Sequence, residues 1–247
     1  MKSTAASPNE IMWGEFQHAN EINPAQRHRI RIVVGEVGNA PRTIADLGCG
    51  SGHLLKRLGS LMPEARRYGL DIEPTALQLA RQQDPGAEFL LADLQASPPE
   101  PPEAIQGKTD VIICSEVLEH LAAPQHLVAL ARGLLRPGGR LIITVPSGPR
   151  TRFDETIGHL RHYTSDSLRA LLEGENLRIV RLYHWGFPFH SMFRMALELL
   201  PSATERFQGE RLSVFAVGLS KLLYWLFFLN IRHATLGRQL VAVATPA

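Results

Sequence analysis

A run of alternating glycines directly after an aspartate is the clearest candidate for chemistry in this chain. Asp46 is followed by Gly48, Gly50 and Gly52. Glycine adopts positive φ readily and carries no Cβ, so a ligand can lie directly against such a backbone. Exposed amide groups beside one carboxylate suit a ligand with both a carboxylate and a cationic amine, such as the amino-acid end of a cofactor. A dinucleotide pyrophosphate would instead favour Gly-x-Gly-x-x-Gly without an acid inside the turn.

Polar residues also end three later apolar runs. Asp71 ends the first, about 20 residues after Gly52, the distance at which an acid can bind both ribose hydroxyls of a nucleoside. Asp93 ends the second and could accept a hydrogen bond from the exocyclic amine of an adenine. Ser115 and Glu116 end the third. We therefore expect a nucleoside to lie across the tips of neighbouring parallel strands.

The elements that must position these residues follow from the alternation of short apolar runs with helix-like segments. This alternation is typical of an α/β fold with a buried, mostly parallel sheet. In a doubly wound sheet, ligands bind at the carboxyl ends of the strands, where the acids are expected. The predicted strands are 43–45, 68–72, 88–93, 110–116, 141–145, 177–183 and 237–244.

Four segments together resemble the successive motifs of class I S-adenosylmethionine (SAM)-dependent methyltransferases, most closely the small-molecule branch that includes quinone-type O-methyltransferases. The segments are 46–54, 69–74, 116–121 and 135–141. The resemblance covers roughly residues 27–186. It implies a Rossmann-like, doubly wound sheet of seven strands with the last antiparallel, and SAM as cofactor. We expect a single domain with an N-terminal helical lid (1–40), a SAM-binding core (41–186), an apolar helical insert (187–236) and a last strand (237–247).

The same resemblance implies roles for individual residues. The glycine turn would line the methionine moiety with Asp46 near its amine, and Asp71 would hold the ribose. Ile72 would pack on adenine, and Asp93 would meet the edge of that base. The full set of expected cofactor-binding residues is Asp46, Gly48, Cys49, Gly50, Gly52, Asp71, Ile72, Asp93, Leu94, Ser115 and Glu116.

Three histidines are the candidate catalytic residues. Methyl transfer needs a base only when the acceptor arrives protonated, and histidine has a pKa suited to that task. His159 is the first candidate, because its segment should border the acceptor side of the pocket, and His162 and His120 follow. The alternative for His159 is a hydrogen-bonding role at the surface.

Composition narrows the classes of partner and compartment. The formal net charge is +2 and no long Lys/Arg run is present, so nucleic acid is not an expected partner. Cys49 and Cys114 are isolated thiols that fit a reducing compartment, and no Cys/His cluster has metal-ligand spacing, so no metal site is expected. The first ten residues lack the apolar stretch of a signal peptide, which favours a cytoplasmic protein.

Two peripheral segments have open interpretations. In the helical segment 10–37, Trp13, Phe16 and His18 either form a lid over the cofactor or pack on the sheet. Within the segment 213–231, the apolar run 214–229 is shorter than the roughly 20 residues of a membrane span. It packs over the domain or in a homodimer, or else it forms a substrate channel or touches a membrane surface, which would make the protein peripheral to a membrane.

The sequence thus predicts a SAM-dependent methyltransferase acting on a small-molecule acceptor at oxygen, with lipophilic metabolites among the candidates and nitrogen or carbon as alternative atoms. A non-catalytic SAM-binding scaffold is a second reading, against which the intact glycines and Asp71 argue. A nicotinamide dehydrogenase is disfavoured by Asp46 and by the absent third-glycine spacing. A methyltransferase of nucleic-acid bases would need an Asn/Asp-Pro-Pro-aromatic turn where this chain has residues 115–118.

Overall fold

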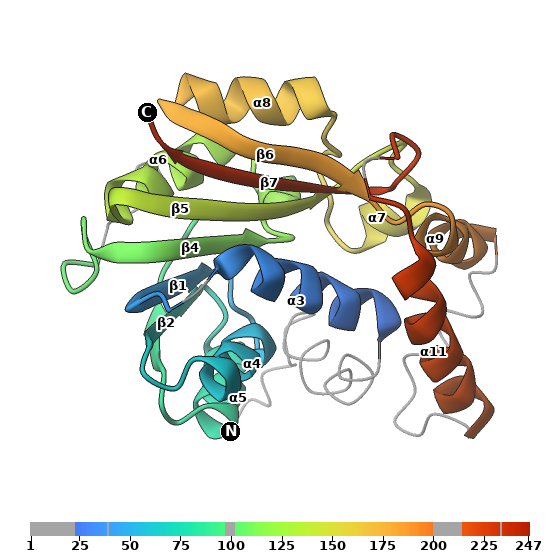
Figure 1. Ribbon diagram of the computed structural model, residues 1–247, viewed down its shortest axis with the longest axis horizontal. Helices are drawn as coiled ribbons and strands as arrows, with labels where there is room; N and C mark the ends of the chain where they lie inside the picture. The colour runs from blue at the N-terminus through green and yellow to red at the C-terminus, as the bar shows by residue number, and fades with distance from the viewer. Residues whose placement is uncertain (1–22, 39, 97–101, 200–213, 233) are drawn as a thin grey trace, which may run out of the picture.

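A seven-stranded sheet forms the centre of the protein, in the strand order β3-β2-β1-β4-β5-β7-β6 (Figure 1). The computed structural model describes residues 23–38, 40–96, 102–199, 214–232 and 234–247. The strands are β1 Thr43–Leu47, β2 Arg66–Asp71, β3 Glu88–Leu91, β4 Thr109–Ser115, β5 Leu135–Pro146, β6 Leu177–Trp185 and β7 Gln239–Pro246. Strands β1 to β5 pair in parallel, and β7 runs antiparallel to both β5 and β6. The predicted Rossmann-like fold is confirmed.

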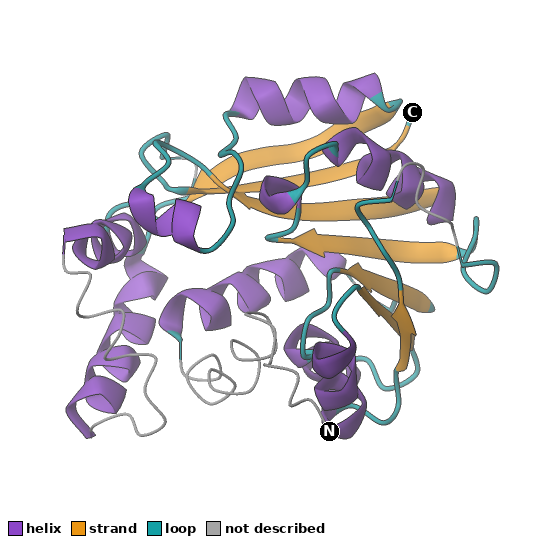
Figure 2. Ribbon diagram, turned by 180° about the vertical axis from the view of Figure 1, so that it is seen from behind, coloured by secondary structure: helices purple, strands orange, loops and turns teal. Residues whose placement is uncertain are grey.

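Helices cover both faces of the sheet, as double winding requires (Figure 2). One apolar core joins the sheet to α3, α4 and α5, and a second joins it to α6 and α8. The helices are α3 Pro24–Val37, α4 His53–Leu61, α5 Pro74–Gln83, α6 Pro124–Leu134, α7 Arg152–Thr156, α8 Ser165–Gly174, α9 Phe189–Leu199 and α11 Val214–Leu226, with 3-10 turns η1 Leu118–His120 and η2 Phe227–Leu229. Strand β1 lies between β2 and β4, so the chain reverses its direction across the sheet there, and a crevice is expected at the carboxyl ends of these strands.

Helix α3 begins where the sequence predicts a break. Asn23 caps it by accepting hydrogen bonds from the amides of Ala25 and Gln26, and Pro24 occupies the first turn, where its missing amide leaves no bond unmade. The proposed lid residues Trp13, Phe16 and His18 lie outside the described residues.

The apolar helix α11 packs against α3. The imidazole of His28 is fully buried, and its Nε2 lies 2.7 Å from the carbonyl oxygen of Tyr224. On its other side α11 and the turn after it leave apolar side chains exposed, among them Leu222, Trp225 and Leu229. Within the described ranges, no helix has both the length and the apolar character to span a bilayer. A contact of this surface with a membrane or a second subunit stays a prediction.

Gly69 sits in the middle of β2 at a point of close packing. A Cβ there would lie 2.6 Å from Cδ1 of Phe89 and 2.8 Å from Sγ of Cys49. We expect Gly69→Ala to lower the free energy of unfolding by about 1–3 kcal/mol, measured by urea denaturation. The matched control is Gly133→Ala in α6, where a Cβ meets nothing within 4 Å. Replacing a helical glycine should raise stability by about 0.5–1 kcal/mol, and equal stability of the two variants would contradict this account.

Candidate functional site

A cavity of about 500 Å³ lies at the carboxyl ends of β1, β2 and β4. Asp46, Asp71 and Ser115, the strand-end residues, line it together. Helix α3 closes another side through Arg29 and Val33. Since doubly wound sheets bind ligands at this position, the cavity is the candidate site.

The glycine turn forms the floor of the cavity. Gly48 and Gly50 line it with φ of 79° and 53°, and a Cβ on Gly48 would lie 2.4 Å from Cγ2 of Val117. Contrary to the expectation of exposed amides, the amides of Gly48 and Cys49 donate to the carbonyl of Leu70, at 2.7 and 3.0 Å. The turn therefore offers close approach to its backbone rather than a row of free donors.

Gly52 has a different role from the other two glycines. It caps α4 with φ of 79° and does not line the cavity. A Cβ on Gly52 would lie 2.9 Å from Cβ of Ala80 and 3.3 Å from Cζ of Phe89. The absence of a side chain at this position lets α4 pack against α5 and β3, which differs from the expected contact with a methionine moiety.

Asp71 is fixed in the cavity wall by the backbone. Its Oδ2 accepts from the amide of Gly50 at 2.7 Å, and its Oδ1 accepts from the amide of Glu73 at 3.0 Å. A carboxylate offers about four acceptor positions, so two remain for a ligand. This geometry suits binding of paired hydroxyl groups.

Asp46 is buried at the end of β1 beside this carboxylate. Burial, and in second place the negative charge of Asp71, raise the pKa of Asp46 to about 7. Its ionisation therefore costs free energy that a cationic group in the cavity would offset.

Asp93 and Leu94, both expected to contact the adenine, lie in different environments. Leu94 is buried and lines the cavity, as does the half-exposed Ile72. Asp93 is exposed and outside the lining, and its Oδ1 accepts from the amide of Gln95 at 2.8 Å. Gln95, which we did not anticipate, lines the cavity instead of Asp93.

Glu116 enters the cavity wall from a strained backbone with φ of 60°. Its Oε1 accepts from Nε2 of Gln239 at 2.7 Å and from Oγ1 of Thr144 at 3.0 Å. Its Oε2 lies 3.4 Å from the guanidinium of Arg29 on α3. The hydroxyl oxygen of Ser115 lies 2.8 Å from the same Thr144 hydroxyl, at hydrogen-bonding distance. The side chain of Glu116 is thus fixed by partners that come from three other elements.

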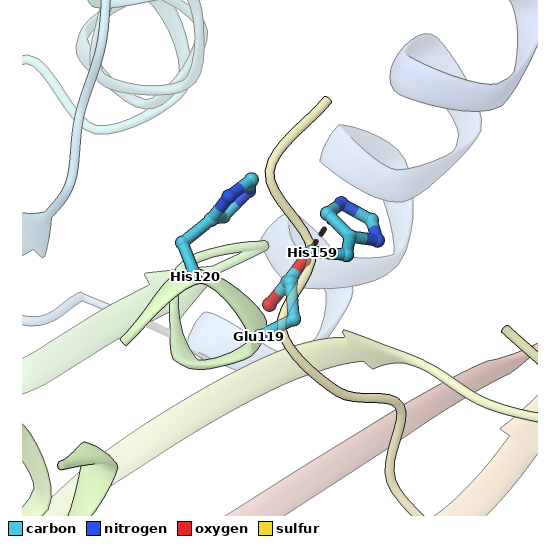
Figure 3. A group of neighbouring side chains, drawn as sticks. All are labelled: Glu119, His120 and His159. Carbon is cyan, nitrogen blue, oxygen red and sulfur yellow. Dashed lines mark ion pairs between the residues drawn. The ribbon is translucent and has the colours of Figure 1, made fainter. Parts of the chain in front are cut away.

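Two of the three candidate histidines, His120 and His159, line the cavity with their rings 4.8 Å apart and nearly perpendicular (Figure 3). Nε2 of His159 lies 3.9 Å from Oε1 of Glu119, and its Nδ1 lies 3.4 Å from Oδ1 of Asp154. Nδ1 of His120 lies 3.2 Å from the carbonyl oxygen of Gly158. Burial, followed by the neighbouring His159, lowers the pKa of His120.

Asp154 is the centre of a buried polar group next to the cavity. Arg194 on α9 donates to its Oδ1, and Thr151 donates to its Oδ2 through its amide and hydroxyl, at 2.9 and 2.8 Å. His162 lies outside the cavity lining, with Nε2 3.4 Å from Oδ2. Burial alone would raise the pKa of Asp154, but hydrogen bonds with His159 and His162 and the charge of Arg194 hold it well below its usual range.

Glu119 is the main residue that the sequence analysis missed. Its side chain is fully buried, and neither carboxylate oxygen has a hydrogen-bond partner among the described residues. Burial, and then the charge of Glu116, raise the pKa of Glu119 well above its usual range. The contacts of Glu119, Arg29 and Arg194 join segments far apart in the chain, so no local spacing could have indicated them.

Comparisons with known proteins agree with this geometry. Residues 45–141, which run from β1 into β5, match the model of a methyltransferase domain family. The chain is 35% identical over 138 residues to a trans-aconitate 2-methyltransferase of Paracidovorax citrulli, covering 56% of this chain and 50% of that protein. It is 28% identical over 145 residues to a ubiquinone biosynthesis O-methyltransferase of Pseudomonas paraeruginosa, covering 58% and 60%. The chain spans about half the length of the curated relatives it matches.

A solved structure with a similar fold is the Haemonchus contortus phospholethanolamine N-methyltransferase 2 in complex with phosphomonomethylethanolamine and S-adenosylhomocysteine (SAH). The TM-score is 0.64, and the match covers 96% of this chain and 58% of that chain. The sequence identity is 16%, so this likeness concerns the fold alone.

Proposed function

We propose that this chain, whose core is a class I SAM-dependent methyltransferase domain, transfers the methyl group of SAM to an oxygen of a small-molecule acceptor. The observation that carries the proposal is the single cavity in which the glycine turn, Asp46 and Asp71 meet two histidines. Oxygen is favoured because histidines suit an acceptor that must lose a proton, and because an O-methyltransferase is among the relatives.

The residues present fit the cofactor. A cavity of about 500 Å³ is within the usual range for ligands of this size. Asp46 would bind the amine and Arg29 the carboxylate of the methionine moiety, since each carries the complementary charge. Asp71 would bind the ribose through its two remaining acceptor positions, and Ile72 would pack against the base.

The cofactor supplies a methyl group on a positively charged sulfur, which makes the methyl carbon electrophilic. The protein must hold the acceptor oxygen in line with that carbon and exclude water. Such positioning is worth about 7–11 kcal/mol. In this proposal His120 and His159, which line the same cavity, promote loss of the acceptor's proton.

The test is a transfer assay with the full chain and a panel of phenols, vicinal diphenols, hydroxy acids, carboxylic acids and amines. SAH formation reports turnover, and the position of the new methyl group is read by NMR. Acceptor-dependent SAH formation with methylation at oxygen is expected. Tight binding of SAM with no turnover across the panel would favour a non-catalytic scaffold, and transfer to nitrogen or carbon would reject the assignment of the atom.

The affinity for SAH should depend on pH through Asp46. Because its folded-state pKa is raised to about 7, unliganded Asp46 keeps its proton below that pH and is a carboxylate above it. The cationic amine binds the carboxylate, so the dissociation constant should fall about tenfold between pH 6 and pH 8. The raised pKa also means that the folded, unliganded protein holds this proton more tightly than the unfolded chain does. Its free energy of unfolding should therefore decrease as the pH rises through 7. Calorimetry on wild type and Asp46→Asn checks this, since an unchanged pH profile in the variant would assign the effect elsewhere.

A further inference from the structure

Glu119, His120 and His159 form a compact group of potential metal ligands beside the cofactor cavity (Figure 3). One ligand atom from each lies within 4.8 Å of the other two. Glu119 and His120 are neighbours on η1, and His159 follows α7. The two segments are tied by a hydrogen bond from the amide of Leu160 to the carbonyl of Glu119, at 2.8 Å.

The carboxylate of Glu119 is the first indication that these three side chains bind a ligand. Both of its oxygens are buried and lack hydrogen-bond partners within the described part of the chain. Buried carboxylates are normally paired, hydrogen-bonded or bound to a metal, because an uncompensated one costs several kcal/mol. His159 is close to Oε1, at 3.9 Å, but not at hydrogen-bonding distance.

The orientation of His159 is the second sign. Its Nδ1 faces Oδ1 of Asp154 at 3.4 Å, and Arg194 and Thr151 hold that carboxylate in place. Metal-binding histidines usually donate their other ring N–H to a carboxylate in this way. With Nδ1 so engaged, the lone pair of Nε2 is left on the side of Glu119.

We propose that Glu119, His120 and His159 bind one divalent transition-metal ion, whose open coordination positions take an acceptor through two adjacent oxygen atoms, one of them a hydroxyl. This proposal rests on the proposed methyltransferase function. Two imidazoles and one carboxylate suit zinc, manganese, iron(II) or cobalt and leave positions open for substrate. With metal–ligand bonds of about 2 Å, neighbouring ligand atoms lie about 3.3 Å apart, so side-chain shifts of about 1 Å would close the site.

A second possible set, Asp154, His159 and His162, is less suitable. Asp154 already binds Arg194 and caps α7 through Thr151, so its oxygens are engaged. His162 also lies outside the cavity, where it could not present a metal to an acceptor.

The metal would replace a general base. Coordination lowers the pKa of bound water from 15.7 to about 7, and an acceptor hydroxyl would be acidified in the same sense. The proton leaves to solvent, and the oxygen electron pair forms the bond to the methyl carbon. The methyl–sulfur bond breaks with its pair staying on sulfur, which gives neutral SAH and leaves the metal's oxidation state unchanged. Vicinal diphenols and 2-hydroxy acids are the acceptor classes that offer the required oxygen pair.

Metal binding is tested directly, without SAM or acceptor. The full chain is stripped with a chelator and titrated with Mn²⁺ and Zn²⁺ by calorimetry, and Co²⁺ is added to read its visible absorption spectrum. We expect one ion per chain with a Co²⁺ spectrum typical of nitrogen and oxygen ligands. Glu119→Gln and His159→Ala should each weaken binding at least about tenfold.

Glu155→Gln is the matched control, because this carboxylate is exposed and pairs with Arg150 rather than with the proposed ligands, so its replacement should leave the titration unchanged. Circular dichroism establishes that each variant is folded, and Glu119→Gln preserves the side-chain shape. Equal metal affinity of wild type and Glu119→Gln would overturn the site. Metal binding without any methyl transfer would refute the proposed function but not the metal site. Methyl transfer that persists at full rate in the metal-free protein would refute the proposed role of the metal but not the methyltransferase function.

Discussion

Asp71→Ala should weaken SAH binding by about 2–4 kcal/mol, which corresponds to about 30- to 1,000-fold in the dissociation constant. The carboxylate lines the cavity with two acceptor positions left for the ribose, so its loss removes charge-assisted hydrogen bonds to the ligand. The amides of Gly50 and Glu73 would also lose their acceptor, and the glycine turn would lose its fixed position against β2. Isothermal titration calorimetry at pH 8 measures the effect.

Asp93→Ala is the matched control for this prediction. Asp93 lies just after β3, as Asp71 lies at the end of β2, but it is exposed and its Oδ1 accepts a hydrogen bond from the amide of Gln95. We expect the SAH affinity of Asp93→Ala to stay within about twofold of wild type, as for most surface substitutions. Equal losses in the two variants would show that strand-end charge, rather than the geometry around Asp71, governs binding.

The contrast between these two aspartates shows what periodicity can and cannot predict. Apolar runs ending in acids predict the strands and the edge at which they end, and the observed sheet confirms that fold. The direction of a side chain after a strand ends depends on the dihedral angles of a single loop. Asp71 and Asp93 look alike in the sequence, yet only the first lines the cavity.

The glycine turn shows the same limit at the level of the backbone. Its spacing predicts positive φ, and Gly48, Gly50 and Gly52 all have it. The partners of its amides depend on β2, whose Leu70 carbonyl and Asp71 carboxylate accept from the turn. Those acceptors are fixed by sheet register, which local spacing does not specify.

The histidine side of the cavity was the least predictable part of the site. Its polar residues come from η1, the segment after α7, and α9, and their contacts depend on how these pack at the end of the sheet. His159 and His162 are close in sequence, but only His159 reaches the cavity. Glu119 lies in η1, three residues after Glu116, and its sequence position gave no indication of a role, because its burial becomes evident only in three dimensions.

Asp154→Ala should lower the free energy of unfolding by about 3 kcal/mol and the rate of methyl transfer by about 10- to 100-fold. The substitution leaves Arg194 beside two histidines without their shared carboxylate, and it removes the Asp154 half of the capping box of α7. His159 would then lose the acceptor that fixes its Nδ1. Because Asp154 acts by positioning His159, we expect kcat to fall more than KM rises. Urea denaturation and steady-state kinetics measure the two effects.

Two variants separate positioning from stability. Glu155→Ala changes an exposed carboxylate in the same helix, whose pairing with Arg150 is worth at most about 1 kcal/mol, so it should leave both quantities nearly unchanged. Asp154→Asn keeps the side-chain shape and one oxygen acceptor but not the charge, and it should recover part of the stability without the full rate. If Asp154→Ala lowered stability but left kcat at the wild-type value, His159 would not depend on this carboxylate, and the link between the buried polar group and the cavity would have to be abandoned.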